Sequence, residues 1–218
     1  MIELINITKQ YGEGPGKTEA LRGINLSIEK GSFIAIMGPS GSGKSTLLNI
    51  LGGMTAPSTG QYLFMNEDVG KMSGHELEVF RRKHIAFVFQ NFALMNRYTV
   101  FENVEMPLLA RKIKNRTELV NHCLEEVGML SLSGKNVNEI SGGERQRTAI
   151  ARALAMDTDV LLADEPTGAL DRNTGNEIMS LFEKIHKNGK TVILITHDEQ
   201  VAACAERIVR IENGLQVN

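Results

Sequence analysis

The sequence predicts an α/β fold with a mostly parallel sheet at its core. Apolar, β-branched runs at 160–163 and 191–195 are joined by a helical pattern at about 174–187, which is the βαβ arrangement of parallel strands. A glycine-rich loop at 38–45 stands between a strand pattern and a helical pattern. From about 91 to 157 strand signals vanish and helical patterns replace them. Together these observations predict an α/β core interrupted by a helical insert.

The glycine-rich loop matches the pattern G-x-x-x-x-G-K-[ST]. Its residues are Gly38, Pro39, Ser40, Gly41, Ser42, Gly43, Lys44 and Ser45, and Thr46 follows. Glycines let the backbone curl so that successive N–H groups face phosphate oxygens, and the new helix adds its positive end. Lys44 is expected to reach the β- and γ-phosphates, and Ser45 to place its hydroxyl on Mg²⁺. A chance lysine in a glycine-rich turn is the alternative, which the strand at 32–37 and the helix at 46–51 disfavour. The loop predicts nucleoside triphosphate binding.

The other elements follow from alternation, capping and turn residues. Strands are expected at 2–7, 21–28, 61–65 and 85–89, and helices at 73–83, 100–112, 117–128 and 142–156. Residues 11–17 are expected to form a flexible loop because of their glycine and proline content. Ser73 and Glu76 fit a capping box. At the C-terminal end, Asn213-Gly214 between 208–211 and 215–217 predicts a hairpin.

One domain over 1–218 accommodates all of these elements. Its α/β part is expected to comprise 1–90 and 158–218, and the helical insert 91–157. The chain has 218 residues, of which 42% are hydrophobic and 23% charged, as in ordinary globular proteins.

Charge and hydropathy disfavour nucleic-acid-binding, membrane-spanning and secreted proteins. A net charge of −2 and a pI near 6.2 give no general attraction to nucleic acid. No apolar stretch approaches the ~18 residues that a membrane span requires, and the N-terminus lacks a signal-peptide layout. Cys123 and Cys204 stand far apart and are expected to be buried free thiols in a reducing compartment. These features predict a cytosolic protein that reaches a membrane only through a partner.

A second half of the nucleotide site is predicted where the apolar run at 160–163 ends in Asp164 and Glu165. The carboxyl ends of parallel strands line the ligand crevice, so both acids are expected near the loop. Asp164 would hold Mg²⁺ through water, and Glu165 could polarise the attacking water as a general base. The alternative is a strand capped by solvated acids.

Residues 141–144 precede a helix and permit two interpretations. Ser141 and Glu144 can form a capping box and nothing more. Alternatively, Gly142 and Gly143 open a second anion site, with free N–H groups facing a γ-phosphate. Spacing alone does not decide between them.

The motifs resemble, in kind and in order, those of an ATP-binding-cassette (ABC) nucleotide-binding domain. They are the loop at 38–45, Gln90, Ile140–Glu144, Asp164-Glu165, Ala169–Asp171 and His197. The resemblance covers essentially the whole chain. It implies a P-loop NTPase cassette with an N-terminal antiparallel β region and a helical subdomain. It also implies ATP and Mg²⁺ as cofactors, and a homodimer in which each signature loop closes over the partner's phosphate loop.

Family roles carry over to matching positions. Tyr11 resembles the aromatic that stacks on adenine, Gln90 the glutamine that contacts Mg²⁺ and water, and Asp171 the aspartate at the dimer seam. Ser141, Gly142, Gly143 and Glu144 resemble the γ-phosphate-binding signature, and His197 the switch histidine that holds the γ-phosphate and Glu165. The resemblance thus implies a catalytic set of Glu165, His197, Gln90 and Lys44, and a metal set of Ser45, Gln90 and Asp164.

Further segments resemble the MacB/LolD-type group of exporter and lipoprotein-release ATPases. These are the extended loop after Tyr11, Phe89–Met95, Thr99–Leu108 and Ala163–Gly168. The resemblance implies an integral membrane permease as partner and a location on the cytoplasmic face of the cell membrane. Ile140 replaces the usual leucine, Glu144 a common glutamine, and Asn96-Arg97 a proline-containing turn; the last departure bears on the identity of the partner.

Two other functions compete with transport. A non-transport ABC ATPase acting on ribosomes or nucleic acid is disfavoured by the acidic balance and the absence of basic arms. A phosphate-loop kinase would need an acceptor site and lid arginines, for which no residues are evident.

Overall fold

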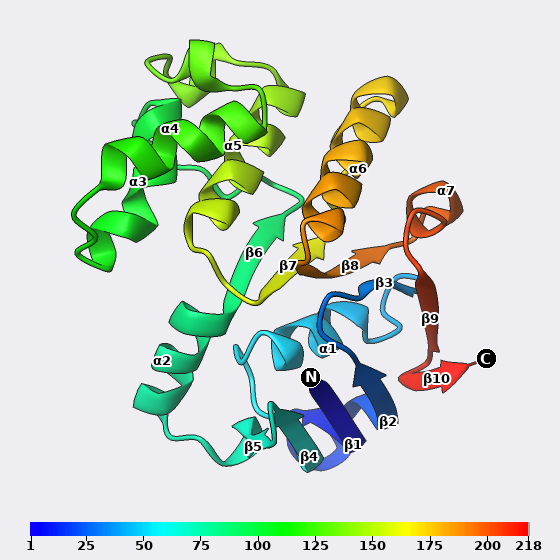
Figure 1. Cartoon of the computed structure of the whole chain (residues 1–218). Helices are drawn as coiled ribbons and strands as arrows, with labels where there is room; N and C mark the ends of the chain where they lie inside the picture. Colours follow the sequence, from blue (N-terminus) through cyan, green and yellow to red (C-terminus); the bar gives the residue numbers. More distant parts are fainter. Residues whose placement is uncertain (218) are drawn as a thin grey trace.

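The strands lie in two sheets in the computed structural model, which describes residues 1–217 (Figure 1). One sheet is 4-stranded with the order β2-β1-β4-β5, and the other is 6-stranded with the order β10-β9-β3-β8-β7-β6. The strands are β1 (Ile2–Tyr11), β2 (Thr18–Ile28), β3 (Phe33–Met37), β4 (Thr59–Phe64), β5 (Glu67–Asp68), β6 (Ile85–Phe89), β7 (Val160–Asp164), β8 (Thr191–Thr196), β9 (Arg207–Glu212) and β10 (Leu215–Val217). The predicted antiparallel N-terminal region and mostly parallel core are both confirmed.

Helices occupy the segments where helical patterns were expected, with small differences at their ends. They are α1 (Lys44–Leu51), α2 (Gly74–His84), α3 (Val100–Ala110), α4 (Arg116–Glu126), α5 (Gly142–Ala155), α6 (Arg172–Lys187) and α7 (Glu199–Ala202). Short 3₁₀ turns are η1 (Gly14–Gly16), η2 (Val69–Lys71), η3 (Leu130–Leu132) and η4 (Val137–Glu139). The capping box of Ser73 and Glu76 is confirmed. The helix α6 begins earlier than predicted because Asp171 caps it, accepting from the N–H groups of Asn173 and Thr174.

Two apolar layers enclose the six-stranded sheet. In β3 the side chains alternate: Phe33 and Ala35 belong to the core under the helices, whereas Ile34 and Ile36 face α1 and the antiparallel sheet. All of these residues are at most 2% exposed, so both faces of the strand are covered, as its continuous apolar run predicts. The helices α3, α4 and α5 gather to one side of the molecule (Figure 1).

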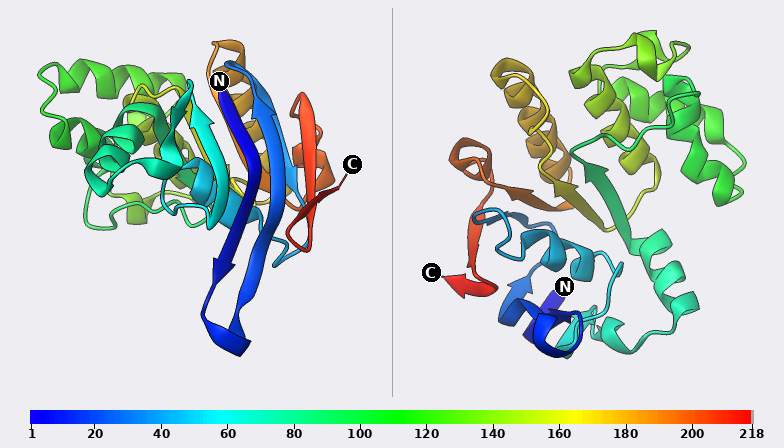
Figure 2. Two further views of the ribbon diagram at one scale, coloured as in Figure 1. Left: turned by 90° about the horizontal axis from the view of Figure 1, so that it is seen from below. Right: turned by 180° about the vertical axis from the view of Figure 1, so that it is seen from behind.

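Two expectations about particular segments need correction. The loop expected at 11–17 begins one residue later, because Tyr11 still belongs to β1, and a 3₁₀ turn occupies 14–16 of it. The β1–β2 hairpin that this loop closes projects well beyond the rest of the molecule (Figure 2). Cys123 is buried as predicted, but Cys204 is only half-buried, because it lies just beyond the short surface helix α7.

At a bulge in β1, the backbone of Asn6 packs directly against the backbone of Gly60 in β4. The pairing of β1 with β4 shifts register between Ile5 and Thr8, and Asn6 has a positive φ of 49°. Gly60, at φ 94°, sits opposite this bulge, where an added Cβ would lie 2.4 Å from the Asn6 carbonyl oxygen. Only glycine fits there without displacing the backbone.

We therefore expect Gly60→Ala to lower the free energy of unfolding by about 2–4 kcal/mol, measured by urea denaturation. Gly74→Ala is the matched control, because a Cβ at Gly74 meets nothing within 4 Å and helix α2 favours alanine. It should raise the free energy of unfolding by up to about 0.5 kcal/mol. Equal effects of the two substitutions would contradict the close approach at Gly60.

Candidate nucleotide-binding site

Four parallel strands end within one residue of each other at one edge of the six-stranded sheet. Phe89 pairs with Asp164, Asp164 with Ile195, and Ile195 with Ile36. The residue that follows each strand therefore emerges at the same edge: Gly38 after β3, His197 after β8, Glu165 after β7 and Gln90 after β6. The topology thus gathers four separately predicted motifs into one place.

The loop between β3 and α1 has the geometry of a phosphate cradle. Gly41 and Gly43 adopt positive φ values of 76° and 104°, and Gly43 is the N-cap of α1 without a side-chain cap. The first N–H groups of α1 are therefore directed out of the helix and available to an anion. Lys44 is 8% exposed and its Nζ donates to the carbonyl oxygens of Gly38 and Pro39, at 2.7 and 2.8 Å.

The acidic pair after β7 has two different environments. Glu165 has a positive φ of 46°, and its Oε1 lies 2.7 Å from His197 Nδ1. Asp164 is half-buried, and burial raises the pKa of its carboxyl group, with the charge of Glu165 adding to the effect and Lys44 opposing it. Lys44 is thus close enough to affect the Asp164 carboxyl group, and Asp164 lies near the phosphate loop, where it was expected.

Gln90 and a residue that the sequence reasoning missed border the segment after Glu165. An added Cβ on Gly168 would lie 2.9 Å from Gln90 Nε2, so the glutamine side chain rests against this segment. Gln146 is fully buried, and its Nε2 donates to the Pro166 carbonyl oxygen at 2.7 Å. A glutamine on the apolar side of the helical pattern at 142–156 was the signal that could have identified it.

The signature residues form the predicted capping box. The Ser141 N–H donates to Glu144 Oε2 at 2.7 Å and the hydroxyl to the same oxygen at 2.9 Å. These bonds, the backbone one first, lower the pKa of Glu144. Gly143 allows close packing, because a Cβ there would lie 2.4 Å from Thr174 Cγ2. Thr174 in turn donates its hydroxyl to Asp171 at 2.6 Å, so the signature lies beside Asp171.

Two sets of predicted residues are not brought to the phosphate loop. Within residues 1–217, no hydrogen bond or ion pair joins Ser141–Glu144 to residues 38–45, and none joins Tyr11 to them. Tyr11 is 44% exposed at the end of β1, and Lys9 Nζ lies 5.1 Å from its ring centroid. The Tyr11 ring is thus accessible rather than packed in the core.

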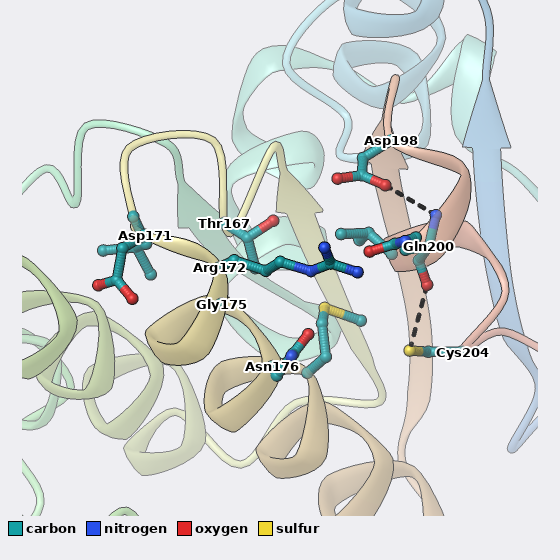
Figure 3. Close-up of a pocket in the computed structure, with 11 residues that line it drawn as sticks. Thr167, Asp171, Arg172, Gly175, Asn176, Asp198, Gln200 and Cys204 are labelled. Atoms are coloured by element: carbon teal, nitrogen blue, oxygen red, sulfur yellow. Dashed lines mark hydrogen bonds between the residues drawn. The ribbon is translucent and has the colours of Figure 1, made fainter.

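A cavity of about 370 Å³ borders the site between α6 and α7. Figure 3 shows the Arg172 side chain reaching across it, with Thr167, Asn176 and Gln200 around it. Asp171 and Asp198 belong to its lining. The cavity therefore reaches from the start of α6 to the residue that follows His197.

Residues 1–217 contain no group of three or more His, Cys, Asp and Glu side chains placed to hold a metal ion. None of the helices in this range is long and apolar enough to cross a membrane.

Comparison with known proteins agrees with this geometry. A family model described as ABC transporter matches residues 21–168. The pyoverdine export ATP-binding/permease protein PvdT of Pseudomonas fluorescens is 46% identical over 98% of this chain, which covers 33% of that relative. YvrO of Bacillus subtilis, an uncharacterized ABC transporter ATP-binding protein, is 44% identical, with 98% of this chain and 94% of YvrO covered. The chain therefore spans about a third of the first of these relatives and nearly all of the second.

A solved structure of an ATP-binding cassette also matches this chain along its whole length. The ATP-binding cassette MJ0796, solved as a dimer in a post-hydrolysis state bound to ADP and Pi, matches with a TM-score of 0.91 and 41% identity, covering 100% of this chain and 97% of MJ0796. Fold and site together define a P-loop NTPase. The chain belongs to the ABC transporter family, and it has the fold of an ATP-binding cassette.

The raised pKa of Asp164 predicts an effect on stability. Its charged form is disfavoured in the folded chain, so the penalty is fully present above the raised pKa and is absent below the ordinary value near ~3.9. Water screens part of it because the group is only half-buried. We expect Asp164→Asn to raise the thermal midpoint of the nucleotide-free protein by about 1–3 °C at pH 7.5, with the gain shrinking as the pH falls toward 4.

Asp157→Asn is the control of opposite sign. The hydrogen bond and charge of Lys190 lower the pKa of Asp157, so its charged form contributes stability above the ordinary pKa and the substitution should slightly lower the midpoint at pH 7.5. A lower midpoint for Asp164→Asn at this pH would contradict the assigned environment.

Proposed function

We propose that this chain is the ATP-hydrolysing part of an exporter that drives a separate membrane permease, and that it works as a homodimer with two shared ATP sites. The observation that carries the proposal is the convergence of Gly38, Gln90, Glu165 and His197 at one sheet edge. Relatives support the exporter part: PvdT is named for pyoverdine export, and the 42% identical MacB of Hyphomonas neptunium for macrolide export.

Binding of ATP is assigned to the loop and to Tyr11. The N–H groups from Gly41 to Thr46 would face the phosphates. The Lys44 ammonium, now held by two loop carbonyls, would move onto the β- and γ-phosphate oxygens. Tyr11 offers an exposed aromatic face on which adenine could stack.

The donor set of Ser45, Gln90 and Asp164 suits Mg²⁺, a hard cation that prefers oxygen ligands and keeps several waters. Asp164 supports this fit, because its negative charge lies beside Glu165 without full compensation. Bound Mg²⁺ would supply charge neutralisation on the β- and γ-phosphates. Ser45 and Asp164 would hold it, with Gln90 contacting it from the adjacent strand end.

Hydrolysis is assigned to Glu165 and His197. Glu165 would accept a proton from the attacking water, and the bond from His197 fixes the orientation of its carboxylate. Gln90 would orient the same water, and Lys44 would stabilise the charge that develops on the transferred group.

A second copy of the chain would complete each site. Ser141, Gly142 and Gly143 stand at the start of α5 beside Asp171 and away from their own phosphate loop. The Ser141 N–H is bonded to Glu144, so the N–H groups of Gly142 and Gly143 are the ones that can serve a neighbouring molecule. Asp171 would then lie at the seam, and Glu144 would hold the Ser141 loop in shape. MJ0796, 97% of which is covered by the match to this chain, was solved as a dimer.

A groove of about 410 Å³ suits the permease. Its apolar floor includes the stacked rings of Phe87 and Phe89, whose centroids are 5.3 Å apart, and Met54 is 55% exposed at its edge. Four arginines and one glutamate line it: Arg81, Arg82, Arg111, Arg152 and Glu78. A cytoplasmic segment of the permease with an apolar anchor and acidic flanks is complementary to this surface.

The domain division proposed from the sequence gives this groove a role in coupling. The groove is lined by residues of the α/β part (1–90 and 158–218) and of the helical insert (91–157). A permease segment bound in the groove would therefore be displaced when the α/β part and the helical insert move relative to each other. The cassette would lie on the cytoplasmic face of the cell membrane through the permease. The alternative action on ribosomes or nucleic acid has no support, because the family and the named relatives are transport proteins.

Glu165→Gln should bind ATP and dimerise but lose about 10²–10⁴-fold in kcat, the usual contribution of a general base. Phosphate release measures the rate, and light scattering with ATP measures dimer formation. Turnover at the wild-type rate would remove Glu165 from the role of base.

Substitutions in the groove should weaken binding of the permease without affecting ATP hydrolysis by the cassette. With Met54→Asp and Arg82→Glu combined, we expect recovery of the permease from detergent-solubilised membranes to fall by about tenfold. Basal ATP hydrolysis should remain within about twofold of wild type, because neither residue belongs to the site. The exposed Leu119→Asp on α4 is the matched control and should leave both unchanged.

The same purification tests the function itself. Recovery of a permease with few transmembrane helices and a large external domain supports the exporter proposal. Recovery of ribosomes or DNA in place of any permease would overturn it.

A further inference from the structure

The C-terminal hairpin turn lies directly behind the phosphate loop. Asn213 and Gly214, with φ values of 49° and 79°, form the turn between β9 and β10. The Gly214 N–H donates to the Ser42 carbonyl oxygen at 3.0 Å, and the Gly214 carbonyl oxygen accepts from the Arg22 N–H at 2.8 Å. Gly214 is buried although its neighbours Asn213 and Leu215 are exposed. One glycine therefore connects the phosphate loop with β2.

Backbone contacts without intervening side chains surround this connection. An added Cβ on Gly38 would lie 2.0 Å from the Ile211 carbonyl oxygen, and one on Gly43 would lie 2.4 Å from the Ala20 carbonyl oxygen. An added Cβ on Gly214 would lie 2.9 Å from that same Ala20 oxygen. The back of the loop thus rests on β9 and β2, and it has little room to shift as a whole.

The hydrogen bond to Ser42 also fixes the direction of one N–H group. The Ser42 carbonyl and the Gly43 N–H belong to the same planar trans peptide, so they point in opposite directions. Because the carbonyl is held toward Gly214, the Gly43 N–H is directed away from the hairpin. Glycine tolerates rotation of the peptides that flank it, so a free peptide here could turn its oxygen toward an anion.

We propose that Gly214 is a positioning residue for nucleotide binding: its N–H holds the Ser42–Gly43 peptide so that the Gly43 N–H faces a phosphate oxygen. The Gly214 carbonyl oxygen accepts from Arg22 in β2, so Gly214 links the phosphate loop to this strand. In turn, β2 pairs with the end of β1 through Thr18 and Tyr11. The phosphate loop and the proposed adenine-stacking residue are thereby held in one frame. The proposal rests on the assignment of residues 38–45 as the phosphate-binding loop.

Replacement of the Gly214 N–H by an ester oxygen tests the proposal without adding any side chain. The native Cys204 permits ligation of a synthetic segment 204–218 to a thioester of residues 1–203, followed by refolding of the full chain. The ester protein carries glycolic acid at position 214, and the matched control is the all-amide protein made by the same route. The measurement is the dissociation constant of ADP in excess Mg²⁺ by titration calorimetry, which requires no turnover.

We expect the ester protein to bind ADP about five- to tenfold more weakly than the all-amide control, the effect of losing one hydrogen bond and opposing two oxygens. A merely structural role would lower the thermal midpoint of the nucleotide-free protein and leave the dissociation constant at 10 °C unchanged. An unchanged dissociation constant overturns the proposal.

Recombinant variants give a second test that needs no refolding. Gly214→Ala, strained at φ 79° and by the Ala20 oxygen, should also weaken ADP binding, whereas the exposed Leu215→Ala in the same hairpin should not. Lys44→Ala distinguishes a failure of the loop assignment from a failure of the Gly214 role. If Lys44→Ala binds ADP normally, the loop assignment fails; if it loses binding while both Gly214 changes bind normally, only the role of Gly214 fails.

Discussion

The closely aligned ends of β3, β8, β7 and β6 are the constraint on which the rest of the structure depends. Parallel pairing of Met37 with Thr196, and of Phe89 with Asp164 and Asp164 with Ile195, fixes where the residue after each strand emerges. A slip of one residue would exchange the faces of a strand that is buried on both sides, so the apolar core enforces the register. The same packing that stabilises the sheet therefore also positions the nucleotide site.

Charge at this edge is arranged at some cost to stability. Asp164 lies half-buried beside Glu165, which raises its pKa, and only Lys44 opposes the effect. The nearby Glu165 takes a positive φ and a bond from His197. Strained backbone and uncompensated charge at one place are typical of a site shaped for a ligand rather than for folding.

Much of the fold could be predicted from the sequence because its signals are local. Alternation identified the strands, the Ser73 and Ser141 capping boxes identified helix starts, and Asn213-Gly214 identified the hairpin. The motif order placed the acidic pair opposite the phosphate loop. The position of the acidic pair follows from the topology of parallel sheets. The other features depend on neighbours within a few positions along the chain, which is where propensity and patterning act.

What the sequence could not provide depends on contacts between distant segments. Nothing in the residues around Gly214 indicated that its N–H meets Ser42. The position of Gln146 on an apolar helix face could mark it as unusual, but it did not indicate Pro166 as the partner. Residues 11–17 were expected to be a flexible loop because glycine content hid the pairing of Tyr11 with Thr18. The exposure of Cys204 follows from its place beyond a four-residue helix, too short for periodicity to indicate a buried face.

We propose that each site takes its phosphate loop from one copy of the chain and Ser141 from another. Mixing two inactive variants, Lys44→Ala and Ser141→Ala, tests it most directly. In a mixed dimer one site combines the intact Lys44 loop with the intact Ser141 signature, and the other site carries both defects. The account predicts that ATP hydrolysis reappears on mixing. If each copy works alone, no combination restores a complete site, and a mixture as inactive as its components would contradict the account.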